Sequence, residues 1–227
     1  MNLALLEKTL GVTFKNKDLL EESLTHRSYL NENIKWRLPH NERLEYLGDA
    51  VLELIVSEAL YKKFPSYPEG QLTVLRAALV NYQMLARVAE ELNLSDFILM
   101  SRGEKGDSRK AKEVILANAI EAVVGAIYLD QGLEVARKFV EHLLMGRVDE
   151  IVKTKSYKDP KSELQEIAQE KNKLTPTYSV LEETGPAHDR IFHVGVYFGT
   201  EMIAEGTGTS KQEAEVAAAK QALQKLD

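Results

Sequence analysis

Residues 114–132, VILANAIEAVVGAIYLDQG, constrain the fold more than any other segment of this sequence. Apolar residues occupy nearly every side of the helix that this segment predicts, so the helix should be buried within a domain. Its longest apolar part, residues 117–129, is too short to span a bilayer and is interrupted by Asn118 and Glu121. The segment therefore indicates the interior of a helical domain.

Most of the first 150 residues are also predicted to be helical, because apolar residues recur at helical spacing without sustained β-type alternation. Glycine and proline cluster in FPSYPEG, residues 64–70, and glycines and charges occur together in SRGEKGDSRK, residues 101–110. Both segments are expected to be loops. The stretches with helical spacing are residues 3–10, 18–24, 43–61, 72–92, 114–129 and 133–151.

The pattern changes after residue 150. A polar stretch leads to Asp159 and Pro160, which suit the cap and the first turn of a helix. Three strand-like runs follow, TYSVLEE, RIFHVGVYF and MIAEGTGTS, and then an amphipathic helix, SKQEAEVAAAKQALQKL. We therefore predict an all-α domain at residues 1–150, a linker at 151–158 and a small α+β domain, ordered α-β-β-β-α, at 159–227.

Two acidic residues lie on one face of the predicted helix over residues 43–61. Glu45 and Asp49 are four positions apart, so their Cβ atoms are about 5–6 Å apart, and Glu42 could extend the cluster. Such a pair is either a solvated acidic face or half of a cation site. Gly48 favours the second interpretation, because a helical glycine costs about 1 kcal/mol relative to Ala and is easier to explain where another segment approaches closely.

A third acid, Glu121, lies in the apolar helix three positions after Asn118. A buried Glu is costly unless an Arg or Lys pairs with it or a metal ion binds it. Together with Glu45 and Asp49, a shared Mg²⁺ site is the simpler explanation, since Mg²⁺ binds a few carboxylates and keeps several waters. The chain has no cysteine and no HxxxH pair, so a zinc site is not expected.

Other functional classes find little support. The absence of cysteine excludes disulfides and thiol nucleophiles and suits a reducing cytosol. There is no GxSxG elbow and no glycine-rich phosphate loop, and the first residues, MNLALLEKTLGVTF, lack the features of a signal peptide. We expect a cytoplasmic protein without a membrane segment or a small-molecule cofactor.

Several segments resemble bacterial ribonuclease III. They are ESLTHRSY (22–29), HNERLEYLGDAVLE (40–53), EGQLTVLRAALV (69–80) and ILANAIEAVVGAIYLDQG (115–132). The end of the chain, with SKQEAEVAAAKQAL at 210–223, resembles a double-stranded-RNA-binding domain. The resemblance covers essentially the whole chain, and ERLEYLGDAVLE is its most specific part. It implies an all-α nuclease domain followed by a small α+β double-stranded-RNA-binding domain.

The resemblance implies a homodimeric endonuclease that cuts double-stranded RNA with Mg²⁺, for which Mn²⁺ can substitute. Products would carry 5′-phosphate and 3′-hydroxyl ends, and precursor ribosomal RNA and messenger RNA would be substrates. Asp49 and Glu121 would be the residues most needed for the chemistry. The metal-site residues that the resemblance implies are Glu45, Asp49, Asn118 and Glu121.

Two positions depart from the family pattern. The family's usual Asp at position 118 is Asn here, which keeps a carbonyl oxygen for Mg²⁺ but loses one negative charge and should weaken the site. Tyr46 stands where the family often has a Phe that packs across the dimer interface, and its hydroxyl would need a partner. An alternative is a duplex-RNA-binding protein whose nuclease activity is impaired by Asn118. A helical hydrolase of small molecules fits the C-terminal domain poorly.

The resemblance also implies RNA contacts in the C-terminal domain, from its first helix, its GPAHD loop and the start of its last helix. The residues are Gln165, Glu166, His188, Ser210 and Lys211. Residues 159–227 hold 7 Lys and Arg against 12 Asp and Glu, which accounts for −5 of the chain's net charge of −6. Duplex RNA is recognised mainly by shape through a few contacts, so we expect weak binding by the isolated domain and avidity from the dimer.

Overall fold

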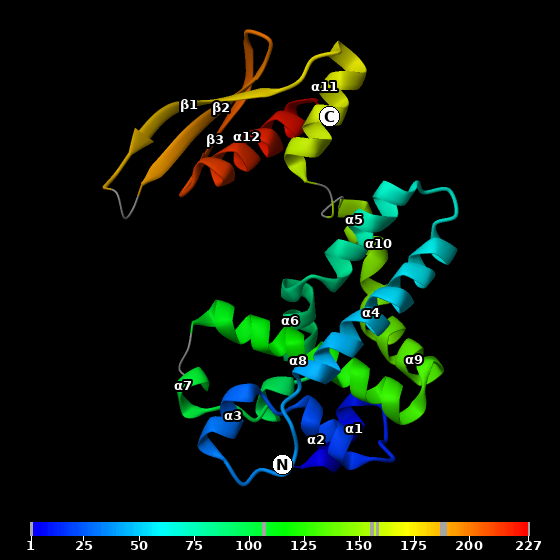
Figure 1. Ribbon diagram of the computed structural model, residues 1–227. Coiled ribbons are helices and arrows are strands. Elements are labelled where there is room, and N and C mark those ends of the chain that lie inside the picture. The colour runs from blue at the N-terminus through cyan, green and yellow to red at the C-terminus, as the bar shows by residue number, and fades with distance from the viewer. Residues whose placement is uncertain (1, 106–107, 155–156, 158, 187–189, 227) are drawn as a thin grey trace. The chain divides into compact units, whose positions relative to one another are not determined.

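The computed structural model describes residues 2–105, 108–154, 157, 159–186 and 190–226. The chain divides into two compact units, Met1–Tyr157 and Lys158–Asp227 (Figure 1). Each unit has a hydrophobic core of its own. The first is helical and the second has the order α-β-β-β-α, which confirms the predicted fold class. No helix among the described residues is both long enough and apolar enough to cross a membrane.

The first unit consists of helices that pack around one apolar core. They are α1 (Leu3–Leu10), α2 (Lys17–Ser23), α3 (Arg27–Glu32), α4 (Glu42–Lys63), α5 (Glu69–Val80), α6 (Tyr82–Glu91), η1 (Leu94–Asp96), α7 (Arg102–Lys105), α8 (Arg109–Gln131), α9 (Leu133–Leu144), η2 (Met145–Arg147) and α10 (Val148–Thr154). As the sequence predicts, α8 is buried along most of its length. Helix α10 extends into the segment for which we predicted a linker, because Val148 and Ile151 are buried in this core.

Asn81 divides the stretch of helical spacing over residues 72–92 into α5 and α6. Its backbone is extended, with φ −69° and ψ 158°. Its side-chain oxygen accepts a hydrogen bond from the Met84 N–H at 2.9 Å, while its amide nitrogen donates to the carbonyl of Ala78 at 3.0 Å. One side chain therefore ends α5 and begins α6, and periodicity alone gives no sign of the break because Leu79 and Leu85 are both buried.

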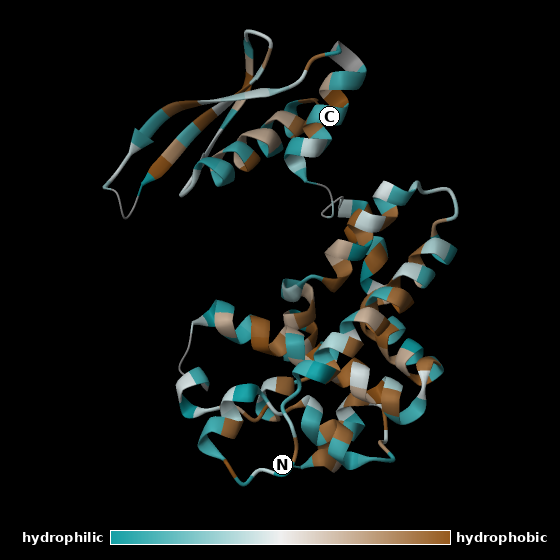
Figure 2. Ribbon diagram, viewed as in Figure 1, coloured by the Kyte–Doolittle hydropathy of each residue, from teal (hydrophilic) through white to brown (hydrophobic). Residues whose placement is uncertain are grey.

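Helices α4 and α8 cross with their backbones in contact at Gly48 and Gly125. A Cβ at Gly48 would lie 1.7 Å from the Glu121 carbonyl oxygen, and one at Gly125 would lie 2.3 Å from the Leu44 carbonyl oxygen. Only glycine permits so close an approach. Both helices are rich in apolar residues (Figure 2), and many of these belong to the core of the first unit. The expectation that another segment lies close to Gly48 is confirmed, and residues 45–49 are brought beside 118–121.

The second unit is a three-stranded antiparallel sheet with helices on one face. Its elements are α11 (Pro160–Asn172), β1 (Thr177–Thr184), β2 (Ile191–Phe198), β3 (Glu201–Gly208) and α12 (Lys211–Leu226), and the strand order is β1-β2-β3. The Asp159 side chain accepts the Ser162 N–H at 3.1 Å and caps α11, as predicted. Alanines of α12 pack on β3, where a Cβ at Gly206 would lie 2.2 Å from the Ala218 nitrogen.

We expect Gly48→Ala to destabilise the protein by at least about 2 kcal/mol, because the new methyl group would collide with backbone that cannot move aside. The matched control is Gly70→Ala in α5, where nothing lies within 4 Å of the added Cβ and the change should fall within about 1 kcal/mol of wild type. Urea unfolding of both variants measures the difference. Equal stability of the two variants would contradict the close crossing.

Candidate active site

The crossing of α4 and α8 gathers the four residues that the sequence indicates as a metal site. Glu45 and Asp49 come from α4, and Asn118 and Glu121 come from α8. Asp49 is exposed, whereas the other three are partly buried. The carboxylates of Glu45 and Asp49 act electrostatically on Glu121, and Asn118 hydrogen-bonds to Glu45. The structure therefore places Glu45, Asp49 and Glu121 within electrostatic reach of one another, with Asn118 acting on Glu45.

Burial and neighbouring negative charges raise the pKa values of two carboxyl groups in this cluster. Burial, followed by the charges of Asp49 and Glu45, raises the pKa of Glu121 to about 7. The pKa of Glu45 is also raised, mainly by burial and then by the charge of Glu42, while its hydrogen bond with Asn118 acts in the opposite direction. Anions held this close are stabilised by a cation, and pKa shifts of this kind are typical of functional sites.

Glu42 has partners outside the cluster. Its two carboxylate oxygens lie 3.4 Å from Arg27 Nη1 and 3.7 Å from His40 Nδ1. Its charge still contributes to the raised pKa of Glu45. Glu42 thus extends the acidic cluster electrostatically, as its position in the sequence suggested, while its side chain is paired with neighbouring bases.

Asn118 on α8 acts on Glu45 of α4. The side chain of an asparagine offers donor hydrogens on its nitrogen and an acceptor oxygen, and toward the Glu45 carboxylate it can only donate. Its carbonyl oxygen is then the atom left for a cation. Position 118 therefore favours the charged form of Glu45 and carries a neutral amide oxygen.

The donor set fits a hard divalent cation such as Mg²⁺, which prefers oxygen ligands. The observation that supports the fit is the raised pKa of Glu121, caused by burial and then by the charges of Asp49 and Glu45, because a bound cation would stabilise the charged form of this carboxyl group. Within the part of the chain that the structure describes, however, no three His, Asp or Glu side chains are gathered closely enough to hold a metal ion. Ligation by Glu45, Asp49, Asn118 and Glu121 therefore stays a prediction.

The second unit contains the residues predicted to contact RNA. Gln165 and Glu166 are exposed on α11. The Ser210 hydroxyl accepts the Glu213 N–H at 3.2 Å, so it caps α12, and Lys211 is exposed in the first turn of that helix. The remaining residue, His188, lies outside the described residues.

Sequence reasoning missed two contributors to these sites. Gly125 is the counterpart of Gly48 in the helix crossing, and a glycine in the middle of a buried helix was the available signal. Glu183 lies 3.3 Å from the Lys211 ammonium. Nothing in the sequence pattern joins those two residues, because their proximity depends on how α12 packs on the sheet.

The raised pKa of Glu121 predicts a pH-dependent stability in metal-free protein. Its folded pKa of about 7 exceeds the ordinary value of 4.5, so the folded state binds more protons between these values and loses stability as pH rises through them. We expect Glu121→Gln to be more stable than wild type at pH 8 by about 1–2 kcal/mol, after allowing for solvent screening. The gap should close near pH 4.5.

Urea unfolding in EDTA from pH 4.5 to pH 8 measures this difference. Glu90→Gln, a change of an exposed residue on α6, is the control and should follow wild type throughout. A Glu121→Gln variant that is no more stable than wild type at pH 8 would contradict the assignment of a partly buried carboxyl group with a raised pKa at this position.

Comparison with known proteins places this chain in a family. A model of ribonuclease-III-like proteins matches residues 16–148, and a model of the double-stranded RNA binding motif matches residues 160–226. Ribonuclease 3 of Desulforamulus reducens is 47% identical over 222 residues, which cover 98% of this chain and 90% of that protein. Ribonuclease 3 of Enterococcus faecalis is 43% identical over 221 residues, which cover 97% and 96%.

A solved structure agrees with these matches. The nuclease domain of ribonuclease III from Campylobacter jejuni is 46% identical to this chain, with a TM-score of 0.58, and the match covers 64% of this chain and 97% of that one. The family models together span the nuclease unit and the smaller unit in the order that the fold shows. The chain therefore belongs to the ribonuclease III family.

Proposed function

We propose that this endoribonuclease of the ribonuclease III family hydrolyses double-stranded RNA with Mg²⁺ and leaves 5′-phosphate and 3′-hydroxyl ends. The observation that carries the proposal is the convergence of Glu45, Asp49 and Glu121 where α4 and α8 cross, inside a ribonuclease III nuclease domain. The double-stranded RNA binding motif in the second unit supports duplex RNA as the substrate.

In this proposal the three acidic residues have different roles in metal binding and catalysis. Bound Mg²⁺ supplies the activation of a water for in-line attack on phosphorus and the stabilisation of the leaving 3′ oxygen. Glu45 and Glu121 would hold the ion, with Asp49 and Glu121 most needed for the chemistry. Because the pKa of Glu121 is about 7, this side chain must lose its proton before it can bind a cation near neutral pH.

A second candidate function rests on Asn118. The family resemblance implies an Asp at this position, and the Asn removes one negative charge from the cluster while its amide binds to Glu45. Fewer anionic ligands mean weaker attraction for a divalent cation. The alternative is therefore a protein that binds duplex RNA but cleaves it poorly.

We also propose a homodimer formed through α4. Tyr46, Leu54 and Tyr61 follow one another at intervals of 8 and 7 residues, which places them on one face of the helix, and they are 83%, 55% and 71% exposed. A self-complementary surface of this kind suits a two-fold interface. The Campylobacter jejuni structure is described as flexible in a region involved in dimer formation of its nuclease domain, which supports the proposal.

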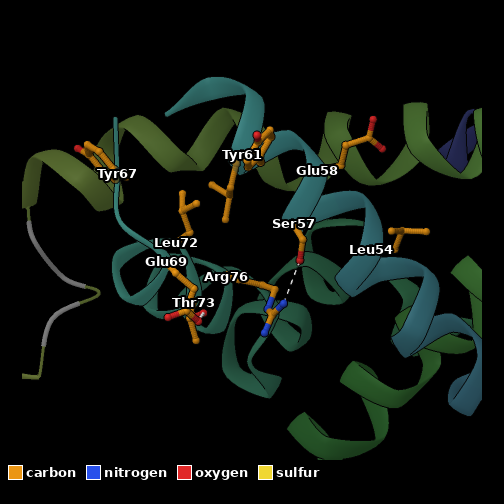
Figure 3. Close-up of a pocket in the computed structure, with 10 residues that line it drawn as sticks. Leu54, Ser57, Glu58, Tyr61, Tyr67, Glu69, Leu72, Thr73 and Arg76 are labelled. Carbon is orange, nitrogen blue, oxygen red and sulfur yellow. Dashed lines mark hydrogen bonds between the residues drawn. The ribbon is translucent and has the colours of Figure 1, made fainter. Parts of the chain in front are cut away.

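A pocket beside this face provides a place for a side chain of the second copy. It has a volume of about 710 Å³ and includes Leu54, Tyr61 and Leu72 in its lining (Figure 3). Arg76 Nη1 donates a hydrogen bond to the Ser57 hydroxyl at 3.0 Å there. The lining thus offers both apolar surface and polar groups, which suits a tyrosine such as Tyr46 of the second copy.

The dimer completes the proposed function. One site cuts one strand, so two sites in a dimer can cut both strands of a duplex in one encounter. The proposed RNA contacts, which are Gln165, Glu166, His188, Ser210 and Lys211, would be duplicated in the dimer and would act with avidity. The substrates that we propose are precursor ribosomal RNA and messenger RNA in the cytoplasm.

Incubation of a long RNA duplex with Mg²⁺, and separately with EDTA, tests the proposal. We expect cleavage only with Mg²⁺, products with 5′-phosphate ends, and a loss of at least about tenfold in rate for Asp49→Asn. Asp96→Asn, an exposed change in η1, should cleave like wild type. Asn118→Asp should require less Mg²⁺ for half-maximal rate.

The outcomes separate the two candidates. Cleavage by Asn118→Asp but not by wild type would support the duplex-binding alternative. Absence of cleavage by both proteins, with duplex binding retained, would contradict an active site at the crossing of α4 and α8.

A further inference from the structure

Lys211 at the beginning of α12 is held by groups of its own domain. Its ammonium lies 3.3 Å from Glu183 Oε1 on β1 and 5.6 Å from the centre of the Phe192 ring on β2. Glu183 and Phe192 are direct cross-strand partners in the antiparallel pair. The start of α12 thus lies against the end of the β1–β2 hairpin (Figure 1). The Glu183 carboxylate therefore forms an ion pair with the lysine that we propose as a phosphate contact.

The same carboxylate has a second cation. Arg190, which directly precedes β2, donates from Nη1 to Glu183 Oε2 at 3.2 Å. The two oxygens of Glu183 therefore face Arg190 and Lys211, one from the hairpin and one from the helix. If Lys211 turned to another anion, the Glu183 charge would keep a partner in Arg190.

The Glu183–Lys211 contact is open to exchange. The Lys211 side chain is 58% exposed and that of Glu183 is 36% exposed, and ion pairs with this much solvent contact are weak. An RNA phosphate that approached Lys211 would therefore face two obstacles. It would have to take the ammonium from Glu183, and it would be repelled by a carboxylate that stays close by.

Glu213 is also acidic and lies in the first turn of α12, but its hydrogen bonds cap the helix. Its carboxylate accepts a hydrogen bond from the Thr209 N–H at 3.0 Å, while its own N–H donates to Ser210. These two bonds, to neighbouring residues before the helix, form its cap. The contacts of Glu183 are ion pairs with Lys211 and Arg190, so its charge can be removed without removing this helix cap.

We propose that Glu183 sets the affinity of this protein for duplex RNA by competing with phosphate for Lys211. The competition keeps each RNA-binding domain weak, so that a cleaved duplex can dissociate while avidity in the dimer retains the substrate. This inference rests on the proposed function, in particular on RNA binding through Lys211.

Fluorescence anisotropy with the full-length chain tests the proposal. The probe is a labelled RNA duplex of about 20 base pairs, longer than the roughly 16 that one such domain spans, and EDTA prevents cleavage. We expect Glu183→Gln to bind about threefold more tightly than wild type at 0.1 M salt, with a smaller gain at higher salt. Lys211→Ala should bind more weakly.

Glu205→Gln is the matched control. It makes the same change of charge in the same domain, but Glu205 lies on β3 and pairs with His193 at 3.0 Å. It should change the affinity by less than Glu183→Gln does. In a protein that already carries Lys211→Ala, Glu183→Gln should raise the affinity for RNA by no more than Glu205→Gln does. The reason is that the effect of Glu183 on RNA binding acts through Lys211.

The outcomes distinguish this inference from the proposed function. If Lys211→Ala weakens binding but Glu183→Gln binds no more tightly than wild type, competition by Glu183 is refuted while RNA binding through Lys211 stands. If Glu205→Gln tightens binding as much as Glu183→Gln does, the effect is one of net charge and the inference is overturned. If Lys211→Ala binds like wild type, both the assignment of Lys211 and the inference fail.

Discussion

The backbone contact between α4 and α8 is the constraint on which the candidate active site depends. Gly48 and Gly125 let two helices that are distant in sequence approach until no Cβ could fit between them. The cost of two glycines inside helices is offset by the buried apolar surface along both helices. This packing energy holds Glu45 and Asp49 near Glu121, and the pKa of Glu121 is raised by burial and then by the charges of Asp49 and Glu45.

The proposed cation site and the proposed RNA-binding surface each have only a moderate electrostatic attraction for their ligands. In the nuclease unit, Asn118 carries no charge where the family resemblance implies an Asp. In the RNA-binding unit, Glu183 holds Lys211, and the unit carries more acids than bases. A weak site can still act effectively when it is duplicated, because binding of the second site becomes intramolecular. Dimerisation through the exposed face of α4 would therefore compensate for weak RNA binding by each copy, whereas the attraction of each nuclease site for its cation would be unchanged.

Much of the fold could be predicted from the sequence, because local patterns determine it. The apolar character of residues 114–132 predicted the buried α8, and alternation predicted the three strands. The break at Asn81 and the helical start of the expected linker depend on a single side chain and on tertiary burial. Charge and spacing indicated the acidic cluster, with Gly48 as a sign of close approach. Gly125 and the Glu183–Lys211 contact arise only when separate elements pack.

The most direct test of the central claim, that acids from α4 and α8 form one divalent-cation site, is the binding of Mn²⁺ by the full-length chain. Electron paramagnetic resonance counts free Mn²⁺ during a titration at pH 8. The claim predicts saturable binding by wild type that Asp49→Asn and Glu121→Gln each weaken by about tenfold or more, although their residues lie on different helices. Equal Mn²⁺ affinity in wild type and both variants would contradict it.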